Sequence, residues 1–133
     1  MKINEMTIVI TGANGVVASE LMDYFSNKAA YVVGTVRQLS KKFEKNKNTT
    51  IIEMDPLDHY SIDNAIAWVE NEAGHIHVWL NIIGGFTMGN RVEEGHDDWN
   101  YMYNTNFMTT LNCCQKILPR MKERDWGRIV NIG

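Results

Sequence analysis

Short apolar runs alternate with amphipathic stretches along the 133 residues of the chain. The apolar runs are rich in β-branched residues and do not alternate in polarity, which is typical of strands in a parallel sheet covered on both faces. They predict strands at residues 6–10, 31–36, 50–54, 76–83 and 128–132. Because strands that alternate with helices form right-handed βαβ units, we expect a doubly wound α/β fold with the strand order 3-2-1-4-5.

The amphipathic stretches predict helices that each bury one stripe of side chains. The second helix begins near Asp58 or Ser61, either of which could be its N-cap, and runs to about Glu72. The third covers most of 97–123. The expected buried stripes are, in chain order, Val17/Leu21/Phe25, Ile62/Ala65/Ile66/Val69 and Phe107/Leu111/Cys114/Leu118/Met121. A segment rich in lysine and asparagine at 41–48 predicts a short exposed helix and loop.

A glycine-bearing turn, Thr11-Gly12-Ala13-Asn14-Gly15-Val16, follows the first predicted strand and opens the first predicted helix. Glycine adopts backbone angles that other residues avoid, so this turn lets backbone amides approach an anion at the helix N-terminus. Ala18 is small enough for close packing of the helix on the strand. We therefore interpret Gly12, Ala13, Asn14, Gly15 and Val16 as a pyrophosphate-binding turn, with a simple tight turn as the alternative.

Further candidates follow the other predicted strands, at the same edge of the sheet. Arg37 stands where an NAD site normally offers an acid to the ribose; its guanidinium suits a 2′-phosphate and favours NADP, with a solvated surface charge as the alternative. Asp55 and Pro56 are candidate cofactor-binding residues; the Asp55 carboxylate could accept a hydrogen bond from the adenine amine or cap the next helix. Asn81 and Gly84 lie where backbone would pass close to the cofactor, although a buried asparagine can also tie neighbouring strands together.

Composition excludes several classes of protein. Hydrophobic residues make up 44% and charged residues 22% of the chain, as in ordinary globular domains, so we expect one domain over 1–133. The net charge of −3 argues against non-specific nucleic-acid binding. The apolar runs are too short for a membrane span or a signal peptide. The sequence thus predicts a cytoplasmic protein.

A metal site is not expected from the histidines and cysteines. His75 and His77 share one face of a predicted strand, but no third ligand is evident near them. Cys113 and Cys114 are sequence neighbours that cannot bridge without strain, and no second pair exists. They are interpreted as reduced thiols in the core or at the surface.

Together these motifs resemble the short-chain dehydrogenase/reductase family over the whole chain. The matching segments occur in the family's order and spacing: 11–15, 55–58, 81–86, Asp98-Trp99, Asn106, 118–121 and 127–132. The resemblance implies a Rossmann-like sheet that binds NADP or NAD. It also implies an oxidoreductase that transfers a hydride between the nicotinamide and a carbonyl or alcohol substrate. The substrate itself cannot be read from these residues.

Two departures from the family pattern matter. Val16 and Ala18 occupy the positions of the second and third turn glycines, so Gly15 fits a Thr-Gly-x-x-Gly-x-x-Gly/Ala variant instead. Of the family's catalytic tetrad only Asn106, which holds a water in a proton relay, falls within the 133 residues; the serine and the Tyr-x-x-x-Lys of the following helix would come after Gly133. The resemblance therefore implies the cofactor-side portion of an enzyme, expected to be inactive by itself. The alternative is a non-catalytic nucleotide-binding or scaffold protein of the same fold.

The last predicted strand, 128–132, also bears on assembly. A complete dinucleotide fold of this type has about six strands, so we expect a sheet that is incomplete on the C-terminal side and ends in an apolar edge. Such an edge is a template for pairing with another chain. The outer face of the long helix, with Met108, Leu111 and Gln115, could add to a contact between subunits. We therefore expect a homo-oligomer.

Overall fold

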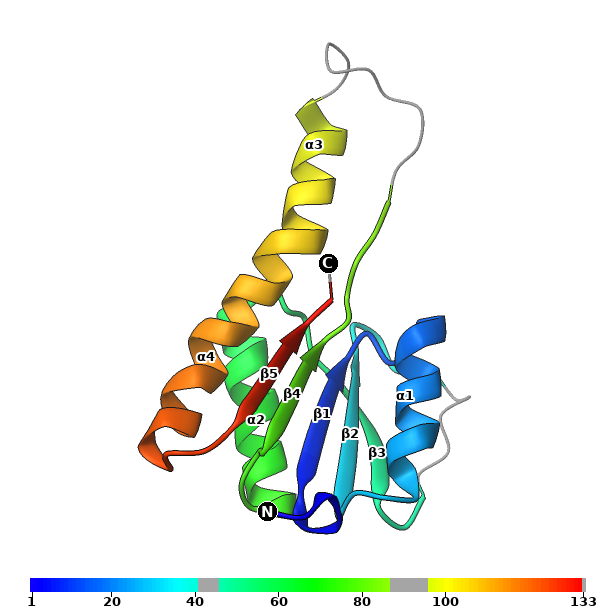
Figure 1. Cartoon of the computed structure of the whole chain (residues 1–133). Coiled ribbons are helices and arrows are strands. Elements are labelled where there is room, and N and C mark those ends of the chain that lie inside the picture. Colours follow the sequence, from blue (N-terminus) through cyan, green and yellow to red (C-terminus); the bar gives the residue numbers. More distant parts are fainter. Residues whose placement is uncertain (41–45, 87–95, 133) are drawn as a thin grey trace.

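The computed structural model describes residues 1–40, 46–86 and 96–132. These residues form a five-stranded parallel sheet in the order β3-β2-β1-β4-β5 (Figure 1). The strands are β1 (Thr7–Thr11), β2 (Tyr31–Val36), β3 (Thr49–Glu53), β4 (Val78–Asn81) and β5 (Arg128–Asn131). The predicted α/β class and strand order are therefore confirmed. Most of the helix and loop predicted at 41–48 lies outside the described residues.

The fourth strand is shorter than the predicted 76–83. It ends at Asn81 because the next amide, that of Ile82, donates to the hydroxyl of Thr11 at 3.0 Å instead of extending the ladder. Ile82 and Ile83 therefore leave the sheet and turn along its C-terminal edge, where both line a cleft. A threonine side chain thus ends the strand and brings two apolar side chains to the candidate site.

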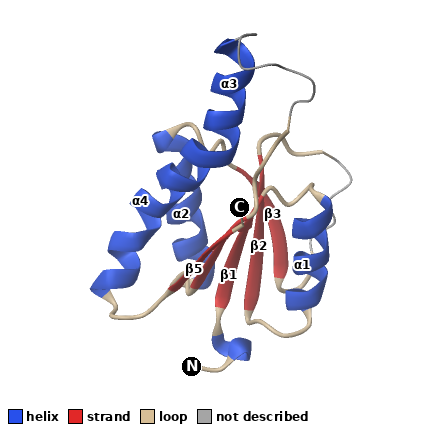
Figure 2. Ribbon diagram, turned by 45° about the horizontal axis from the view of Figure 1, so that its top comes forward, coloured by secondary structure: helices blue, strands red, loops and turns tan. Residues whose placement is uncertain are grey.

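Helices cover both faces of the sheet (Figures 1 and 2). α1 (Val16–Ser26) packs on one face, and α2 (His59–Ala73) and α4 (Thr109–Glu123) pack on the other. The predicted stripe of α2 is confirmed, since all four of its side chains are buried. Asp58, one of the two predicted N-caps, accepts hydrogen bonds from the amides of Tyr60 and Ser61.

The predicted stripe of α1 is confirmed in part: Leu21 and Phe25 pack against the core, but the fully buried positions are shifted by one residue. Ala18 and Met22 are its buried residues, whereas Val17 is 58% exposed. Close packing explains the shift: a Cβ on Gly34 of β2 would lie 2.6 Å from the Cβ of Ala13 and 3.1 Å from the Cε of Met22. Because Gly34 has no side chain, Met22 and Ala13 can pack closely against the sheet. Val17, one position before Ala18, is exposed instead.

The predicted long helix is present but contains a π-helical segment, and its predicted buried stripe is right only in part. α3 (His96–Tyr103) leads into a π-helical segment, η2 (Asn104–Met108), and α4 follows. A π-helix has a wider turn than an α-helix, so side chains beyond it change their facing direction. Phe107 and Leu118 are consequently exposed. The buried positions of α4 are Thr109, Asn112, Cys113, Ile117 and Met121.

β5 lies at the edge of the described sheet, as predicted. It pairs with β4, and Arg128, Val130 and Asn131 are exposed to solvent. Association of this edge with a second chain stays a prediction.

His77 lies directly before β4 and is hydrogen-bonded to the N-terminal end of β1. Its backbone amide donates to the carbonyl of Thr7 at 3.0 Å, and the amide of Thr7 donates to the Nδ1 of His77 at 2.9 Å. This second bond requires an unprotonated Nδ1. Burial lowers the pKa of His77, and the charges of Arg124 and His75 lower it further. The fold therefore favours the neutral imidazole.

We expect the chain to lose stability as the pH falls below histidine's usual pKa of 6.5. The unfolded chain binds the proton more tightly than the folded chain does. The stability contributed by neutral His77 is therefore fully present above pH 6.5, and it declines as the pH drops toward the lowered pKa of the folded chain. His77→Asn keeps a non-titrating acceptor near the position of Nδ1. Measured by urea unfolding, the free energy of unfolding of this variant should fall less between pH 8 and pH 5 than that of wild type. His59→Gln, at an exposed site on α2, should show the same fall as wild type. Identical pH profiles for His77→Asn and wild type would contradict the assignment.

Candidate functional site

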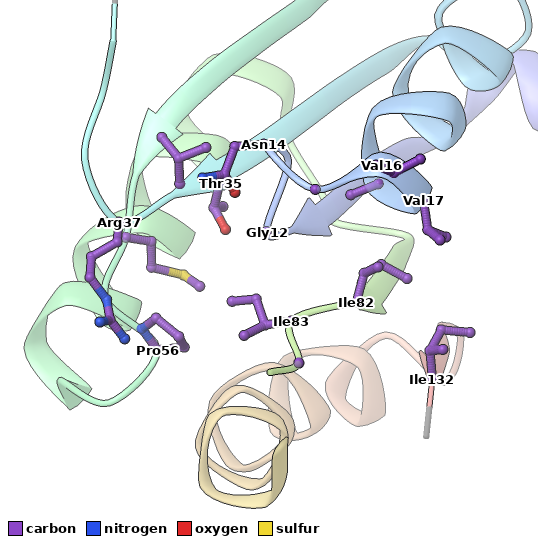
Figure 3. A pocket seen from close by; sticks show the side chains of 15 residues that line it. Gly12, Asn14, Val16, Val17, Thr35, Arg37, Pro56, Ile82, Ile83 and Ile132 are labelled. Atoms are coloured by element: carbon purple, nitrogen blue, oxygen red, sulfur yellow. The ribbon is translucent and has the colours of Figure 1, made fainter. Parts of the chain in front are cut away.

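A cleft of about 480 Å³ opens at the C-terminal edge of the sheet (Figure 3). Its walls come from the β1–α1 turn, the end of β2, the segment after β3, the segment after β4 and the end of β5. The lining residues are Gly12, Asn14, Gly15, Val16, Val17, Ala18, Thr35, Val36, Arg37, Met54, Pro56, Ile82, Ile83, Gly84 and Ile132. The structure thus brings together seven of the predicted binding residues: Gly12, Asn14, Gly15, Val16, Arg37, Pro56 and Gly84.

The turn between β1 and α1 is built around Gly12. Its φ of +66° is in the left-handed region, and a Cβ there would lie 2.9 Å from the Cγ1 of Ile83. The turn is closed by a hydrogen bond from the amide of Gly15 to the carbonyl of Gly12 at 2.9 Å. Glycine at position 12 therefore both permits the backbone angle and keeps the passage between the turn and Ile83 open.

The N-terminus of α1 presents free amides to the cleft. The first helical bond runs from the amide of Ser19 to the carbonyl of Gly15, so the amides of residues 16–18 have no partner within the helix. The first turn carries no acidic side chain that would neutralise the positive end of the helix dipole. This arrangement suits an anion such as a phosphate.

Val16 and Val17 stand at the rim of the cleft. Val16 is 83% exposed and occupies the position that is glycine in the usual turn pattern. Ala13, also predicted as a binding residue, is buried instead; its amide donates to the carbonyl of Thr35 at 2.9 Å. Ala13 is absent from the cleft lining because its side chain packs beneath the turn, against Gly34.

Arg37 supplies the cationic side chain of the cleft. It is exposed at the end of β2 and lies on the side opposite Val17, beside Pro56 (Figure 3). Among the described residues no carboxylate forms an ion pair with it. The carboxylate of Glu53, on the neighbouring strand, instead accepts from the amide of Leu39 at 2.9 Å. The guanidinium of Arg37 is therefore open to a ligand.

The segment after β3 contributes Pro56 and Met54 rather than Asp55 to the cleft. The carboxylate of Asp55 accepts from the amide of Leu57 at 2.9 Å, which makes a local turn. It does not cap α2, whose N-cap is Asp58. The carbonyl of Pro56 accepts from the side chain of Asn112 on α4 at 3.0 Å, so the helix layer holds this wall in place.

Asn81 is fully buried and does not line the cleft. Its Oδ1 accepts from the indole N–H of Trp79 at 2.8 Å, and its Nδ2 donates to the Oδ1 of Asn131 at 2.8 Å. Asn131 is also its register partner on β5. The structure therefore favours the second interpretation of Asn81, that it ties two strands together.

Asn106 holds the backbone at the rim of the site. Its Oδ1 accepts from the amide of Gly85 at 2.9 Å, and its Nδ2 donates to the carbonyls of Gly85 and Met102 at 2.8 and 3.0 Å. A Cβ on Gly84 would lie 2.9 Å from this Oδ1, and one on Gly85 would lie 2.7 Å from the hydroxyl oxygen of Tyr101. The two glycines are therefore needed for the close approach of α3 and η2. The side chain of Asn106 is used in positioning Gly85 and does not line the cleft.

Sequence reasoning missed part of the cleft and one motif. Thr35 could have been found, because it precedes Arg37 by two residues and so shares its face of β2. The sequence also contains a second feature of interest, a Tyr-x-x-x-Lys pattern from Tyr24 to Lys28. Tyr24 is exposed in the last turns of α1, with the ammonium of Lys28 4.7 Å from its ring centre. The cleft lies at the opposite end of that helix, so this pair is no part of the site.

Other reactive side chains do not form a second centre in the described parts of the chain. Groups of three or more His, Cys, Asp or Glu side chains able to hold a metal are absent from them. Burial raises the pKa of the Cys113 thiol to about 12, so it is a poor nucleophile. None of the helices over these same residues is long and apolar enough to cross a membrane.

Comparison with known proteins identifies similar chains. The family model described as short chain dehydrogenase matches residues 6–133. An uncharacterized oxidoreductase of Bacillus subtilis is 25% identical over 138 residues, which cover 100% of this chain and 52% of that protein. An NADP-dependent 3-hydroxy acid dehydrogenase of Escherichia coli K12 is 27% identical over 136 residues, covering 96% of this chain and 54% of that protein.

Solved structures share the fold. The crystal structure of serine dehydrogenase from Escherichia coli superposes with a TM-score of 0.86 at 26% sequence identity, covering 96% of this chain and 61% of that one. The chain thus spans about half the length of the curated relatives described above.

Proposed function

The chain belongs to the short-chain dehydrogenase family, and from this premise we propose that its cleft binds a nicotinamide dinucleotide, with NADP preferred over NAD. The observation that carries the proposal is the pairing of two anion-binding groups in one cleft. The free amides of α1 line one side, and the guanidinium of Arg37, which has no ion-pair partner among the described residues, lines the other. A pyrophosphate suits the amides, and a ribose 2′-phosphate suits the guanidinium.

The walls of the cleft fit such a ligand. A Cβ at Gly12 would fill the gap beside Ile83. Because glycine has no Cβ, this gap stays open and a phosphate can approach the backbone closely. Met54, Pro56, Ile82 and Ile83 add apolar surface suited to the flat faces of an adenine ring. Gly84 would bring backbone close to the ligand, as predicted from the sequence. For Asp55 and Asn81 the side-chain contacts support structural roles.

The cofactor, when bound, supplies hydride transfer to or from a carbonyl or alcohol carbon. We propose that the whole protein is an oxidoreductase of this type and that these 133 residues are its cofactor-side portion. Asn106 is the one member of the family's catalytic set that has a counterpart in this stretch. Its side chain fixes the backbone at Gly85, which supports a positioning role rather than direct proton transfer. By itself the chain should bind cofactor without turning over substrate.

Arg37→Asp tests the cofactor preference. Removing the guanidinium and adding a carboxylate should weaken NADPH binding by about 10- to 100-fold, the value of a hydrogen-bonded charge pair, while NADH should lose much less. Isothermal titration with both cofactors measures the two affinities. Arg128→Asp, on exposed β5 and outside the cleft lining, is the matched control and should leave both affinities unchanged. Equal weakening of both cofactors by Arg37→Asp would show that Arg37 is only a solvated charge.

A further inference from the structure

The hydroxyl of Thr35 is a buried polar group without a partner. Thr35 is 1% exposed, and no donor or acceptor among the described residues reaches its Oγ1. The neighbouring threonine makes the contrast plain. Thr11 is the register partner of Thr35 on β1, and its hydroxyl donates to the carbonyl of Leu80 at 3.3 Å and accepts from the amide of Ile82 at 3.0 Å. A buried hydroxyl with no partner is costly, so one in the wall of a binding cleft calls for an explanation.

The position of Thr35 points to a ligand. Thr35 lines the cleft, beside Asn14 and between the glycine turn and Arg37 (Figure 3). Side chains alternate along β2: Val32 and Val36 pack on the α1 side, and Val33 packs with Met54 on the other side. Thr35 shares the face of Val33. Its side chain is therefore directed away from α1 and toward the wall formed by Met54 and Pro56.

We propose that the Thr35 hydroxyl binds the adenosine moiety of the dinucleotide. This inference rests on the proposed function: the pyrophosphate at the α1 amides and the 2′-phosphate at Arg37 are joined through the adenosine ribose, which must span the wall between them. Adenosine offers ribose hydroxyls and ring nitrogens, and a threonine hydroxyl can donate to or accept from these groups. Rotation about Cα–Cβ to another staggered rotamer moves the oxygen to a different position, so the same side chain can turn its oxygen toward the cleft.

Thr35→Val gives two effects of opposite sign. In the free chain valine removes an unpaired buried hydroxyl at nearly constant shape, so the melting temperature should rise by about 2–5 °C. Affinity for adenosine 2′,5′-bisphosphate, a probe that keeps the adenosine and both phosphate positions, should fall about 3- to 10-fold. Thr35→Ser should restore most of this affinity. Thr11→Val is the matched control for stability: its hydroxyl makes two bonds, so the melting temperature should fall.

The outcomes separate this inference from the proposed function. If wild type binds adenosine 2′,5′-bisphosphate and Thr35→Val binds it equally well, the assignment of Thr35 is overturned while the nucleotide site stands. A lower melting temperature for free Thr35→Val, as for Thr11→Val, would likewise overturn it, because the hydroxyl would then have a stabilising partner. If wild type binds no adenine nucleotide at all, the proposed function fails and this inference fails with it.

Discussion

Replacing Gly12 with alanine should weaken binding of NADPH by about 100-fold or more, which is the value of losing two charge-assisted hydrogen bonds. The added Cβ would lie 2.9 Å from the Cγ1 of Ile83 and would force a left-handed φ of +66° on a residue that resists it. The turn must shift to relieve the contact, and the amides of residues 16–18 shift with it. Isothermal titration of the two chains measures the loss.

Gly74→Ala is a matched control for the backbone strain in that experiment. Gly74 also has a left-handed φ, +78°, but a Cβ there would meet nothing within 4 Å. Both variants should therefore lose about 1–3 kcal/mol of stability from the backbone angle, and the ψ of −121° at Gly74 lies outside the left-handed helical region. Gly12→Ala alone should lose affinity, since Gly74 ends α2 and does not line the cleft. Unchanged NADPH affinity in folded Gly12→Ala would contradict the placement of the dinucleotide on this turn.

Trp79→Ala should reduce the free energy of unfolding by about 3–5 kcal/mol, the usual cost of deleting a large buried aromatic side chain. Trp79 is 0% exposed and packs with residues of α2 and α4 in the core of that face. Its indole N–H also donates to the Oδ1 of Asn81, whose Nδ2 donates to Asn131 and so joins β4 to β5. The substitution therefore leaves both a cavity and an amide oxygen without its donor. Since small domains are stable by about 5–15 kcal/mol, much of the total would be lost.

Urea unfolding followed by circular dichroism measures this loss, with Trp99→Ala as the control. Trp99 lies on α3 and is 54% exposed, so its removal should change stability by less than about 1 kcal/mol. Similar losses in the two variants would contradict the burial pattern described for β4.

The candidate site could be predicted in part, and the predicted residues that line the cleft share one property. Gly12, Gly15 and Arg37 lie directly after parallel strands, and the carboxyl ends of such strands meet at one edge. Asn81 and Ala13 were predicted by the same reasoning, yet neither lines the cleft. Residues near a strand end alternate between facing the opening and facing the core, and sequence position alone does not distinguish the two.

The helices show a similar division. The stripe of α2 was predicted correctly because an uninterrupted α-helix keeps a constant period of 3.6 residues. The stripe predicted for the long helix is right at Met121 but wrong at Phe107 and Leu118, which are exposed. The π-helical segment at 104–108 changes the phase of the helix. There the side chain of Asn106 is held by the backbone of Gly85, a residue distant in the sequence.

The sequence by itself determined the sheet order, the α/β class and the edge at which the site lies. These depend on runs of apolar residues and on the handedness of crossovers, which are properties of short segments. Tertiary structure alone decided that β4 ends at a bond to Thr11, that Asn81 ties strands, and that the Thr35 hydroxyl in the cleft wall has no partner among the described residues. Each of these depends on contacts between side chains of different strands, and such contacts form only when the chain folds.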